Sequence, residues 1–175
     1  MDSEVADRCA FTVVHSTSRP EAKVLVVSDR VAAGVSQDSS GRALADCLNK
    51  AGFSVVDRQV VADGIDSVAE ALIRMAQNFA GLLITTGGTG FSPRDLTPEA
   101  TLRVLEREAP GMAETMRQAN PPLGGLSRGR AGTVGGCLIL NVPGSVAGAT
   151  ESLGAVLGIL PHALGLLAGS HDGHK

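Results

Sequence analysis

A glycine-rich turn after a short apolar run is the feature that most restricts how this chain can fold. The run spans Gly81 to Thr85, and the chain continues as T-G-G-T-G-F-S-P-R-D-L-T-P-E-A to Ala100. An apolar run that stops at glycines predicts a buried strand ending in a tight connection. We expect Thr97 to cap the following helix, with Pro98 at its first position, and this helix to end near Glu108.

The rest of the chain predicts the same alternation of strands and helices. Further strands are expected at Lys23–Val27, Phe53–Val61, Thr133–Val134 and Cys137–Val142. Helices are expected from Ser39 or Ser40 to Gly52, from a capping box of Ser67 and Glu70, after Pro110-Gly111, and from Val146 with a bend or break near Pro161. The buried stripe expected for the second of these helices is Val68, Leu72, Ile73, Ala76 and Phe79.

This alternation predicts a three-layer α/β fold, with helices on both faces of a mostly parallel sheet. Ligands of such sheets bind beyond the carboxyl ends of the strands, so the loops after Val27, Val61, Thr86 and Val142 should form the site. A length of 175 residues fits one domain. We expect this domain at residues 21–169, between a flexible arm at residues 1–20 and a flexible tail at residues 170–175.

The composition argues against several classes of protein. A net charge of −3, 2% aromatic residues and no Trp or Tyr do not fit nucleic-acid binding, which usually needs a basic surface or stacking rings. The apolar segment Leu153–Ala168 is shorter than the ~20 residues of a membrane span and contains Pro161. The acidic start M-D-S-E-V-A-D is unlike a signal peptide, and the three cysteines have no paired spacing. We therefore expect a cytoplasmic protein that binds neither nucleic acid nor membrane.

The glycines of the turn are suited to an anion. Gly87, Gly88 and Gly90 allow the backbone to turn sharply and to bring N–H groups close to a negative charge. The spacing is not that of a Walker A loop, since no Gly-Lys-Ser/Thr follows, nor the G-x-G-x-x-G of dinucleotide-binding folds. Taken alone, the glycines fit equally well with a plain tight connection between strand and helix.

Charged residues near this turn favour a phosphate site with a metal ion. Arg94 offers a planar cation to phosphate oxygens, and the adjacent Asp95 would repel phosphate unless Mg²⁺ lay between them. Asp63 follows the second strand at the same edge of the sheet and is a second candidate ligand for Mg²⁺. Two alternatives stay open, a solvated ion pair for Arg94-Asp95 and a turn role for Asp63 before Gly64.

Weaker candidates lie in the other loops of this edge. Asp29 follows the first strand, and helix capping is the ordinary explanation for Asp38, Ser39 and Ser40. Ser127-Arg128 and the N-V-P-G-S segment at Asn141–Ser145 could donate to a polar ligand. The four histidines show no metal-ligand spacing, and no Ser/His/Asp or Cys/His arrangement is evident.

Several motifs recur in order along the chain and carry a family resemblance. They are V-S-D-R at Val27–Arg30, D-x-S-G at Asp38–Gly41, A-P-G-M-A-E-T-M-R at Ala109–Arg117, L-S-R at Leu126–Arg128 and I-L-N-V-P-G-S at Ile139–Ser145. Together with the glycine turn, they closely resemble the Mog/MoaB family of molybdenum-cofactor biosynthesis proteins, and the corresponding domain of gephyrin. The likeness runs from about Lys23 to Gly169.

The resemblance implies a trimer, or a dimer of trimers, of three-layer α/β subunits. It implies molybdopterin adenylyltransferase activity, in which AMP passes from Mg-ATP to the terminal phosphate of molybdopterin and pyrophosphate is released. A molybdenum-insertion enzyme is a candidate partner. Asp63 and Asp95 correspond to the family aspartates that bind Mg²⁺ and serve catalysis, the glycine loop to Gly87–Gly90, and the pterin-side serine to Ser127.

Residue chemistry and resemblance together give the expected contacts of the site. Substrate and phosphate are expected to meet Thr86, Gly87, Gly88, Thr89, Gly90, Arg94, Ser127, Arg128, Pro143, Gly144 and Ser145. Secondary candidates are Ser28, Asp29, Asp38, Ser40 and Gly41. Two departures from the family pattern concern the pterin contacts, because Gly136 stands where some relatives have Ser and Val146 where a proline often follows P-G-S.

The alternative to an active enzyme is a catalytically silent molybdopterin-binding paralogue or scaffold module. Asp63 and Asp95 count against it, because binding an anion gains nothing from two acids. The molybdenum-insertion enzyme shares this domain type but carries further domains. A nicotinamide dehydrogenase does not fit the spacing of the glycines.

Overall fold

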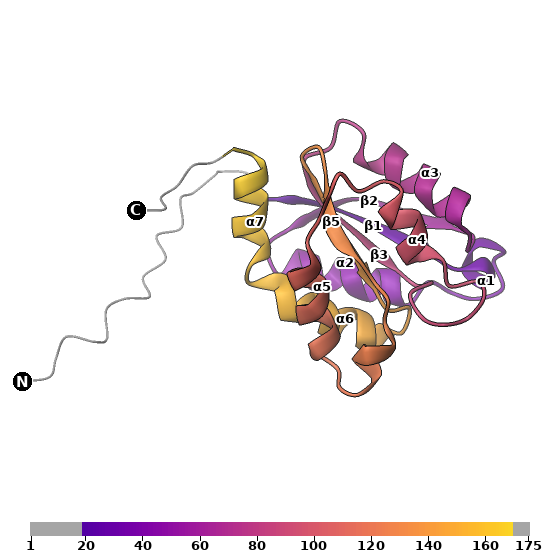
Figure 1. The fold of residues 1–175 in the computed structure, drawn as a ribbon. Helices are drawn as coiled ribbons and strands as arrows, with labels where there is room; N and C mark the ends of the chain where they lie inside the picture. The colour runs from indigo at the N-terminus through magenta and orange to yellow at the C-terminus, as the bar shows by residue number, and fades with distance from the viewer. Residues whose placement is uncertain (1–18, 170–175) are drawn as a thin grey trace, which may run out of the picture.

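Within residues 19–169, which the computed structural model describes, six strands form one mixed sheet (Figure 1). Their order across the sheet is β2 (Ser54–Val61), β1 (Glu21–Val27), β3 (Gly81–Thr86), β6 (Cys137–Val142), β5 (Ala131–Val134) and β4 (Arg107–Glu108). The first four strands run parallel, and β5 and β4 are antiparallel at one edge. The predicted α/β fold with a mostly parallel sheet is confirmed.

Helices cover both faces of this sheet, as expected for strands joined by helical crossovers. One face carries α2 (Ser40–Lys50), α5 (Pro110–Gln118), α6 (Val146–Leu157) and α7 (Leu160–Leu167), and the other carries α3 (Ile65–Ala76) and α4 (Thr97–Leu102). Two short elements, α1 (Asp29–Ala32) and the 3₁₀ helix η1 (Leu123–Leu126), lie between the larger ones. The three predicted layers are present.

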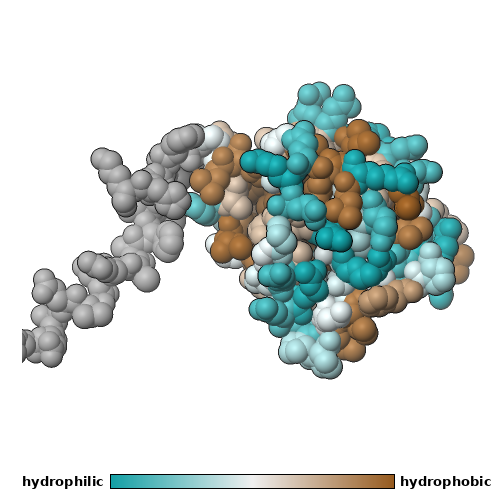
Figure 2. Space-filling view, viewed as in Figure 1, coloured by the Kyte–Doolittle hydropathy of each residue, from teal (hydrophilic) through white to brown (hydrophobic). Residues whose placement is uncertain are grey.

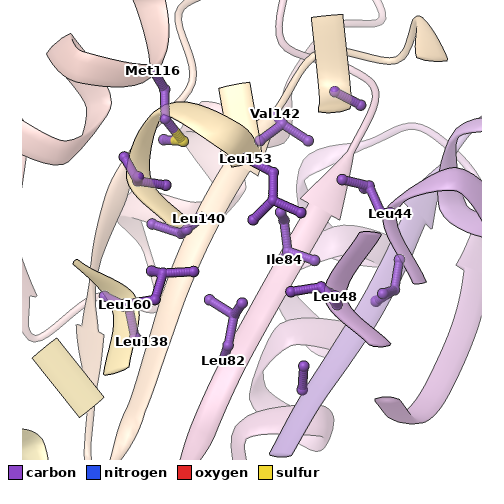
Figure 3. Packing of buried hydrophobic residues seen from close by; sticks show 14 of the residues in the cluster. Leu44, Leu48, Leu82, Ile84, Met116, Leu138, Leu140, Val142, Leu153 and Leu160 are labelled. Carbon is purple, nitrogen blue, oxygen red and sulfur yellow. The ribbon is translucent and has the colours of Figure 1, made fainter. Parts of the chain in front are cut away.

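The central strands contribute side chains to two apolar cores, because successive side chains of a strand point to opposite faces of the sheet. In β3, Leu82 and Ile84 belong to one apolar cluster and Leu83 belongs to the other. Figure 3 shows the first cluster, where these strand residues meet leucines of the covering helices, among them Leu44, Leu48, Leu153 and Leu160. β3 and β6 are buried along their whole length, which explains their continuous apolar runs.

The start of α3 differs from the prediction. Its N-cap is Gly64, and the Ser67 hydroxyl donates to the carbonyl oxygens of Ala62 and Gly64, so the capping box is wrong. The helix begins at Ile65, and this phase places Ile73 outward with 58% of its surface exposed. The buried stripe is Val68, Leu72 and Met75, with Ala69 and Ala71 beside it, whereas Phe79 is buried beyond the helix.

The helix after the glycine turn is shorter than predicted. Leu96 is the N-cap of α4, and the Thr97 hydroxyl instead donates to the carbonyl oxygen of Gly87. The helix ends at Leu102, and the chain then pairs with β5 as the short strand β4, where a helix to Glu108 was expected. The last six residues of the expected helix are therefore not helical, and two of them pair with the sheet edge.

The C-terminal helix is broken, as the sequence predicted. α6 and α7 meet at an angle of 65°, and Leu153, Val156 and Leu160 fill the core from both sides of the break. No single helix in the described range is long and apolar enough to cross a membrane, and only the bent pair α6–α7 reaches that length and composition. Figure 2 shows apolar residues gathered over α7, where Leu166 is 54% exposed.

Two residues of the expected N-terminal arm fall within the described range. The expected arm and tail lie outside it, apart from Arg19 and Pro20 at the end of the arm. Arg19 donates to the carbonyl oxygens of Asn49 and Gly52, and the Pro20 carbonyl accepts from Ser54. These two residues are therefore joined to the turn between α2 and β2.

Candidate functional site

The loops after β1, β3 and β6 meet at Gly87. This residue has a φ of +104°, and a Cβ on it would collide with the carbonyl of Val27 at the end of β1. A Cβ on Gly144, in the loop after β6, would lie 3.2 Å from the Cα of Gly87. Only glycine fits such a close approach of three backbones. The three loops therefore form one continuous surface at the carboxyl edge of the sheet.

The glycine loop, residues 87–90, is fixed by α4. The Thr97 hydroxyl donates to the Gly87 carbonyl over 2.9 Å, and the Thr97 N–H donates to the Gly88 carbonyl over 3.0 Å. Gly88 has a φ of +63°, a left-handed conformation that favours glycine. The buried Thr97 side chain thus links the start of the helix to the loop in place of a helix cap.

Asp63 and Asp29 hold the loops after β2 and β1 together. The Asp29 N–H donates to Asp63 Oδ2 over 2.8 Å, and the Asp63 N–H donates to Asp29 Oδ1 over 3.0 Å. The side chain of Arg94 closes this pair from outside, since it contacts both Asp29 carboxylate oxygens and the Asp63 carbonyl. Asp29, a secondary candidate in the sequence, therefore joins two loops of this edge to Arg94.

Asp63 and Asp95 flank the glycine loop at its two ends. Asp63 Oδ1 lies 3.3 Å from the Cβ position of Gly88, and Asp95 Oδ2 lies 2.9 Å from that of Gly90. Asp95 Oδ2 also accepts from the N–H of Ser92 over 2.9 Å, which fixes the chain after the loop. The second oxygen of each carboxylate accepts no hydrogen bond within residues 19–169.

Arg128 fixes the far end of the glycine loop. Its Nε donates to the Gly90 carbonyl over 2.8 Å, and Nη2 donates to the Asp95 carbonyl over 2.5 Å. Nη1 forms an ion pair with the Glu99 carboxylate, and the Arg128 N–H donates to the Thr89 carbonyl over 2.8 Å. The guanidinium thus positions the loop and does not point to a ligand.

The pKa of Glu99 reflects this ion pair. Partial burial by itself would raise the pKa, but the hydrogen bond and positive charge of Arg128 outweigh it. The pKa of Glu99 therefore lies below its usual value. Ionised Glu99 is the form that holds Arg128 against the loop.

A pocket of about 160 Å³ is lined by Ser127 and Gly129, the two neighbours of Arg128, and by Pro143 and Ser145 from the loop that approaches Gly87. It lies between α5, η1 and the start of α6, and its polar lining is Arg117, Asn120, Ser127, Asn141, Ser145 and Ser152. Apolar lining comes from Met116, Leu123 and Pro143, among others. A pocket lined by both apolar and hydrogen-bonding side chains is suited to a flat heterocycle with several donors and acceptors.

Asn141, one of the residues that line this pocket, is held in place by hydrogen bonds of its side chain. Its side-chain N–H groups donate to the hydroxyls of Thr85 and Thr101, each over 3.0 Å, and Oδ1 accepts from the Arg130 N–H. The residue is only 2% exposed. Buried amides need such partners, so Asn141 joins β3, α4 and the loop before β5.

The structure gathers most of the predicted site residues but gives several a supporting role. Thr86 donates to the Pro143 carbonyl, and Ser145 caps α6 by accepting from the Gly148 N–H. Ser28 caps α1 by accepting from the Val31 N–H. Asp38 accepts from the Gly41 N–H at the start of α2 and lies 3.6 Å from Arg58, while Ser40 is buried there. The capping explanation is thus confirmed for Asp38 and is wrong for Ser39, whose side chain makes no capping hydrogen bond.

The two departures from the family pattern fall in different places. Gly136 lies in the turn before β6, where a Cβ would be 3.2 Å from the Cβ of Ala80. This is the amino end of β6, roughly 20 Å from the glycine loop along the strand. A pterin contact from position 136 of the same subunit is therefore not expected. Val146 is the first residue of α6, next to the pocket residue Ser145.

Sequence reasoning assigned no role in the site to Arg117, Asn120 and Ser152. It expected Thr97 only as a helix cap and Asn141 only as part of a segment that could donate to a ligand, whereas both join elements of the site through buried hydrogen bonds. Arg117 and Asn141 lie inside motifs that carry the family resemblance, which was the available signal. Asn120 and Ser152 carry no motif, and only folding brings α5 and α6 together around them.

The arrangement is compatible with Mg²⁺ bound together with phosphates. No group of three or more His, Cys, Asp or Glu side chains suited to a metal occurs within residues 19–169. Mg²⁺ commonly binds one or two carboxylates, several waters and substrate phosphates, so an all-protein cage is not needed. Asp63 and Asp95 offer carboxylates on either side of a glycine loop, which fits that kind of site.

Comparison with known proteins agrees with this geometry. A family model described as "Probable molybdopterin binding domain" matches residues 23–162. The molybdopterin adenylyltransferase of Helicobacter pylori strain J99 is 37% identical over 154 residues, covering 85% of this chain and 88% of that protein. Gephyrin of Dictyostelium discoideum is 36% identical over 157 residues, but the match covers only 22% of its length.

Solved structures show the same likeness. The molybdopterin biosynthesis enzyme MoaB of Thermus thermophilus superposes with a TM-score of 0.80 at 43% identity, covering 86% of this chain and 97% of that one. A molybdopterin biosynthesis protein of Mycobacterium abscessus gives a TM-score of 0.81 at 34% identity, covering 86% and 97%. The chain therefore belongs to the molybdopterin-binding domain family that contains the Mog and MoaB proteins.

Proposed function

We propose that this protein is a molybdopterin adenylyltransferase, which transfers AMP from Mg-ATP to the terminal phosphate of molybdopterin. The observation that carries the proposal is the glycine loop flanked by Asp63 and Asp95, with a pocket lined by both neighbours of Arg128. Relatives named for this activity match most of the chain. The two halves of the site would hold the two substrates.

In the proposed reaction, an oxygen of the terminal phosphate of molybdopterin attacks the α-phosphorus of ATP. The new oxygen–phosphorus bond forms as the bond to the bridging oxygen of the β-phosphate breaks, and pyrophosphate leaves with that electron pair. The attacking phosphate is mostly dianionic at neutral pH, because its second pKa is about 6. The enzyme therefore needs no general base and must chiefly align two anions that repel each other.

Each part of the site has a proposed task. Backbone N–H groups of the glycine loop would bind phosphate oxygens, and Asp63 and Asp95 would hold Mg²⁺, which neutralises charge on the leaving pyrophosphate. Arg94 is 59% exposed at its side chain and could exchange Asp29 for a phosphate. Arg128 is proposed to keep the loop in place, because its donors already bind Gly90, Asp95 and Glu99.

The pocket is proposed to bind the pterin. Ser127 and Ser145 would face it from the two loops that border the glycine loop, and Asn120 and Ser152 would add further hydrogen-bonding groups. Arg117 donates to the Gly129 carbonyl and so braces the pocket wall. The linkage through Arg128 would set the distance between the pterin and the nucleotide.

The first test measures pyrophosphate release with purified molybdopterin and Mg-ATP. Asp63→Asn and Asp95→Asn should each lower turnover at least about 100-fold, because a preorganised charge at the reacting phosphates is lost. Pterin binding, followed by fluorescence, should change less than about two-fold. The matched control is Asp66→Asn, since Asp66 on α3 is 86% exposed at its side chain and pairs only with Arg103 in the described chain.

Two results would count against the proposal. Unchanged turnover in both aspartate variants would remove their catalytic role. Tight pterin binding by the unaltered protein, with no ATP-dependent pyrophosphate release, would favour the silent binding or scaffold module.

We further propose a cytoplasmic homotrimer or dimer of trimers that passes its product to a molybdenum-insertion enzyme. Support for assembly comes from exposed apolar residues on the last two helices and the turn between them, Val146, Ile159 and Leu166. Light scattering of the purified protein should give a mass of about three or six chains. A monomer at micromolar concentration would contradict this assembly.

A further inference from the structure

Phe91 exposes more of its surface than any other large apolar side chain within residues 19–169. Its exposed fraction is 71%, whereas Phe53 and Phe79 are buried. Scattered exposed apolar residues are normal on protein surfaces and need no explanation alone. The exposed ring of Phe91 points to a function because Phe91 directly follows the glycine loop.

The ring stands on a firmly held segment. Asp95 Oδ2 accepts from the N–H of the next residue, Ser92, and Arg128 binds the carbonyl of the preceding residue, Gly90. The guanidinium carbon of Arg128 lies 5.8 Å from the centroid of the Phe91 ring. Because Glu99 and the Asp95 carbonyl fix the same guanidinium, the ring has a fixed cationic neighbour and still exposes most of its area.

A flat apolar ring beside a phosphate loop is complementary to a nucleobase. Base–aromatic stacking contributes roughly five- to 150-fold in affinity when judged by alanine substitution, and it depends little on the polar edge of the base. A phenyl ring has no donor or acceptor, so it cannot distinguish adenine from guanine by hydrogen bonding. It can distinguish bases by their size, because a larger base places more of its surface against the ring.

We infer that Phe91 is the stacking surface for the base of the nucleotide, and that it selects purine over pyrimidine nucleoside triphosphates. The inference rests on the proposed function, since it takes the nucleotide phosphates to bind at the glycine loop. The exposed ring stacks on the base, and Arg128 supports the ring without donating to the base, because its donors are already bound to Gly90, Asp95 and Glu99. Phe91 contributes to nucleotide affinity and not to the transfer step.

The test compares Phe91→Ala with the unaltered enzyme under steady-state conditions. The KM for Mg-ATP should rise about ten-fold, while the KM for molybdopterin and kcat stay within about two-fold. The preference for ATP and GTP over CTP and UTP should fall towards one. Phe91→Tyr should restore both properties, and Ile73→Ala, which removes an exposed side chain on α3, should change neither.

Direct binding separates this inference from the proposed function. Calorimetry would compare Mg-ATP with Mg-tripolyphosphate, which has phosphates but no base. Turnover by the unaltered enzyme, with equal KM values and base preference in Phe91→Ala, overturns the inference and leaves the function standing. If the unaltered protein shows no turnover but binds ATP about ten-fold more tightly than tripolyphosphate, and Phe91→Ala loses that difference, stacking stands and the function fails. Melting temperatures within about 2 °C of each other would show that each variant is folded.

Discussion

Two short polar side chains, Asp29 and Thr97, show how single residues assemble the loops of this site. Each contacts the backbone of a different loop, Asp29 at Asp63 and Thr97 at Gly87. In the sequence, Thr97 looks like a residue that caps the next helix, and Asp29 is one of several polar residues in the loop after a strand. Their partners are 34 and 10 residues away, so local pattern cannot reveal the role that they take in the fold.

Cys137 provides a prediction that depends on a single buried thiol. It lies at the start of β6, and burial raises its pKa to about 12, which the charge of Lys23 only partly opposes. Because the thiolate is the reactive form, Cys137 should resist alkylation while the protein is folded. In a variant with Cys9 and Cys47 replaced by Ser, iodoacetamide at pH 8 should modify the chain only after denaturant is added.

The same thiol predicts the direction of an alkaline effect. The folded pKa lies above the ordinary value of 9.0, so the folded state keeps its proton where the unfolded state loses it. The contribution of Cys137 to stability is therefore complete below about pH 9 and is lost as the pH rises towards 12. Equal alkylation rates for the native and denatured chains would contradict this placement of the thiol.

At the scale of whole elements, the Arg128–Glu99 ion pair connects α4 to the loop that precedes β5. Because the pKa of Glu99 is lowered in the fold, its stabilising contribution is present above its usual value of about 4.5 and is lost as the pH falls through the folded value. Glu99→Gln should thus be less stable than the unaltered protein at pH 7, by less than about 1 kcal/mol, because water partly screens this half-buried pair. The difference in melting temperature should narrow as the pH falls below about 4.5.

A matched comparison would be Glu108→Gln. Glu108 pairs with Arg130 over 3.3 Å at the exposed edge strand β4 and has no contact with the glycine loop. Its substitution should leave nucleotide affinity unchanged, whereas Glu99→Gln should weaken it through a looser Arg128. If the difference in melting temperature between Glu99→Gln and the unaltered protein is the same at pH 3.5 and pH 7, the ion pair contributes nothing to stability.

The sequence predicted the strands and the long helices because these carry a continuous apolar signal. β3 and β6 are apolar on both faces, and α2 shows apolar residues at helical spacing. The errors fall where a tertiary contact overrides a local preference, as with Thr97 and with residues 107–108, which join the sheet edge. Ser67 likewise bonds to the turn before its helix.

The candidate site likewise has a part that the sequence predicted and a part that it did not. Glycines, Asp63 and Asp95 lie in short motifs at strand ends, and the topology of a parallel sheet then brings those ends together. The pocket depends on α5 and α6, which are neighbours in space with no shared motif. Its lining from Asn120 and Ser152 could therefore not be predicted from spacing.

The molecule as a whole is held by two apolar clusters, one on each face of the sheet, and the larger includes α6 and α7. Leu153→Ala would leave a cavity between α6 and the sheet, since Leu153 is 1% exposed. We expect a loss of about 3 kcal/mol in the free energy of unfolding, measured with denaturant. The control Ile73→Ala, at an exposed position, should cost less than about 1 kcal/mol, and equal losses would contradict the packing seen in Figure 3.

The parallel half of the sheet also decides how this domain can be joined to other proteins. β1 ends at the glycine loop, so its first residue, Glu21, lies roughly 20 Å away at the opposite edge, on the side of Figure 1 where α7 is found. A second catalytic unit tethered ahead of β1 would leave the mouth of the site open to solvent. Fusion to an enzyme that acts on a shared intermediate would then raise the local concentration of that intermediate without obstructing its entry or exit.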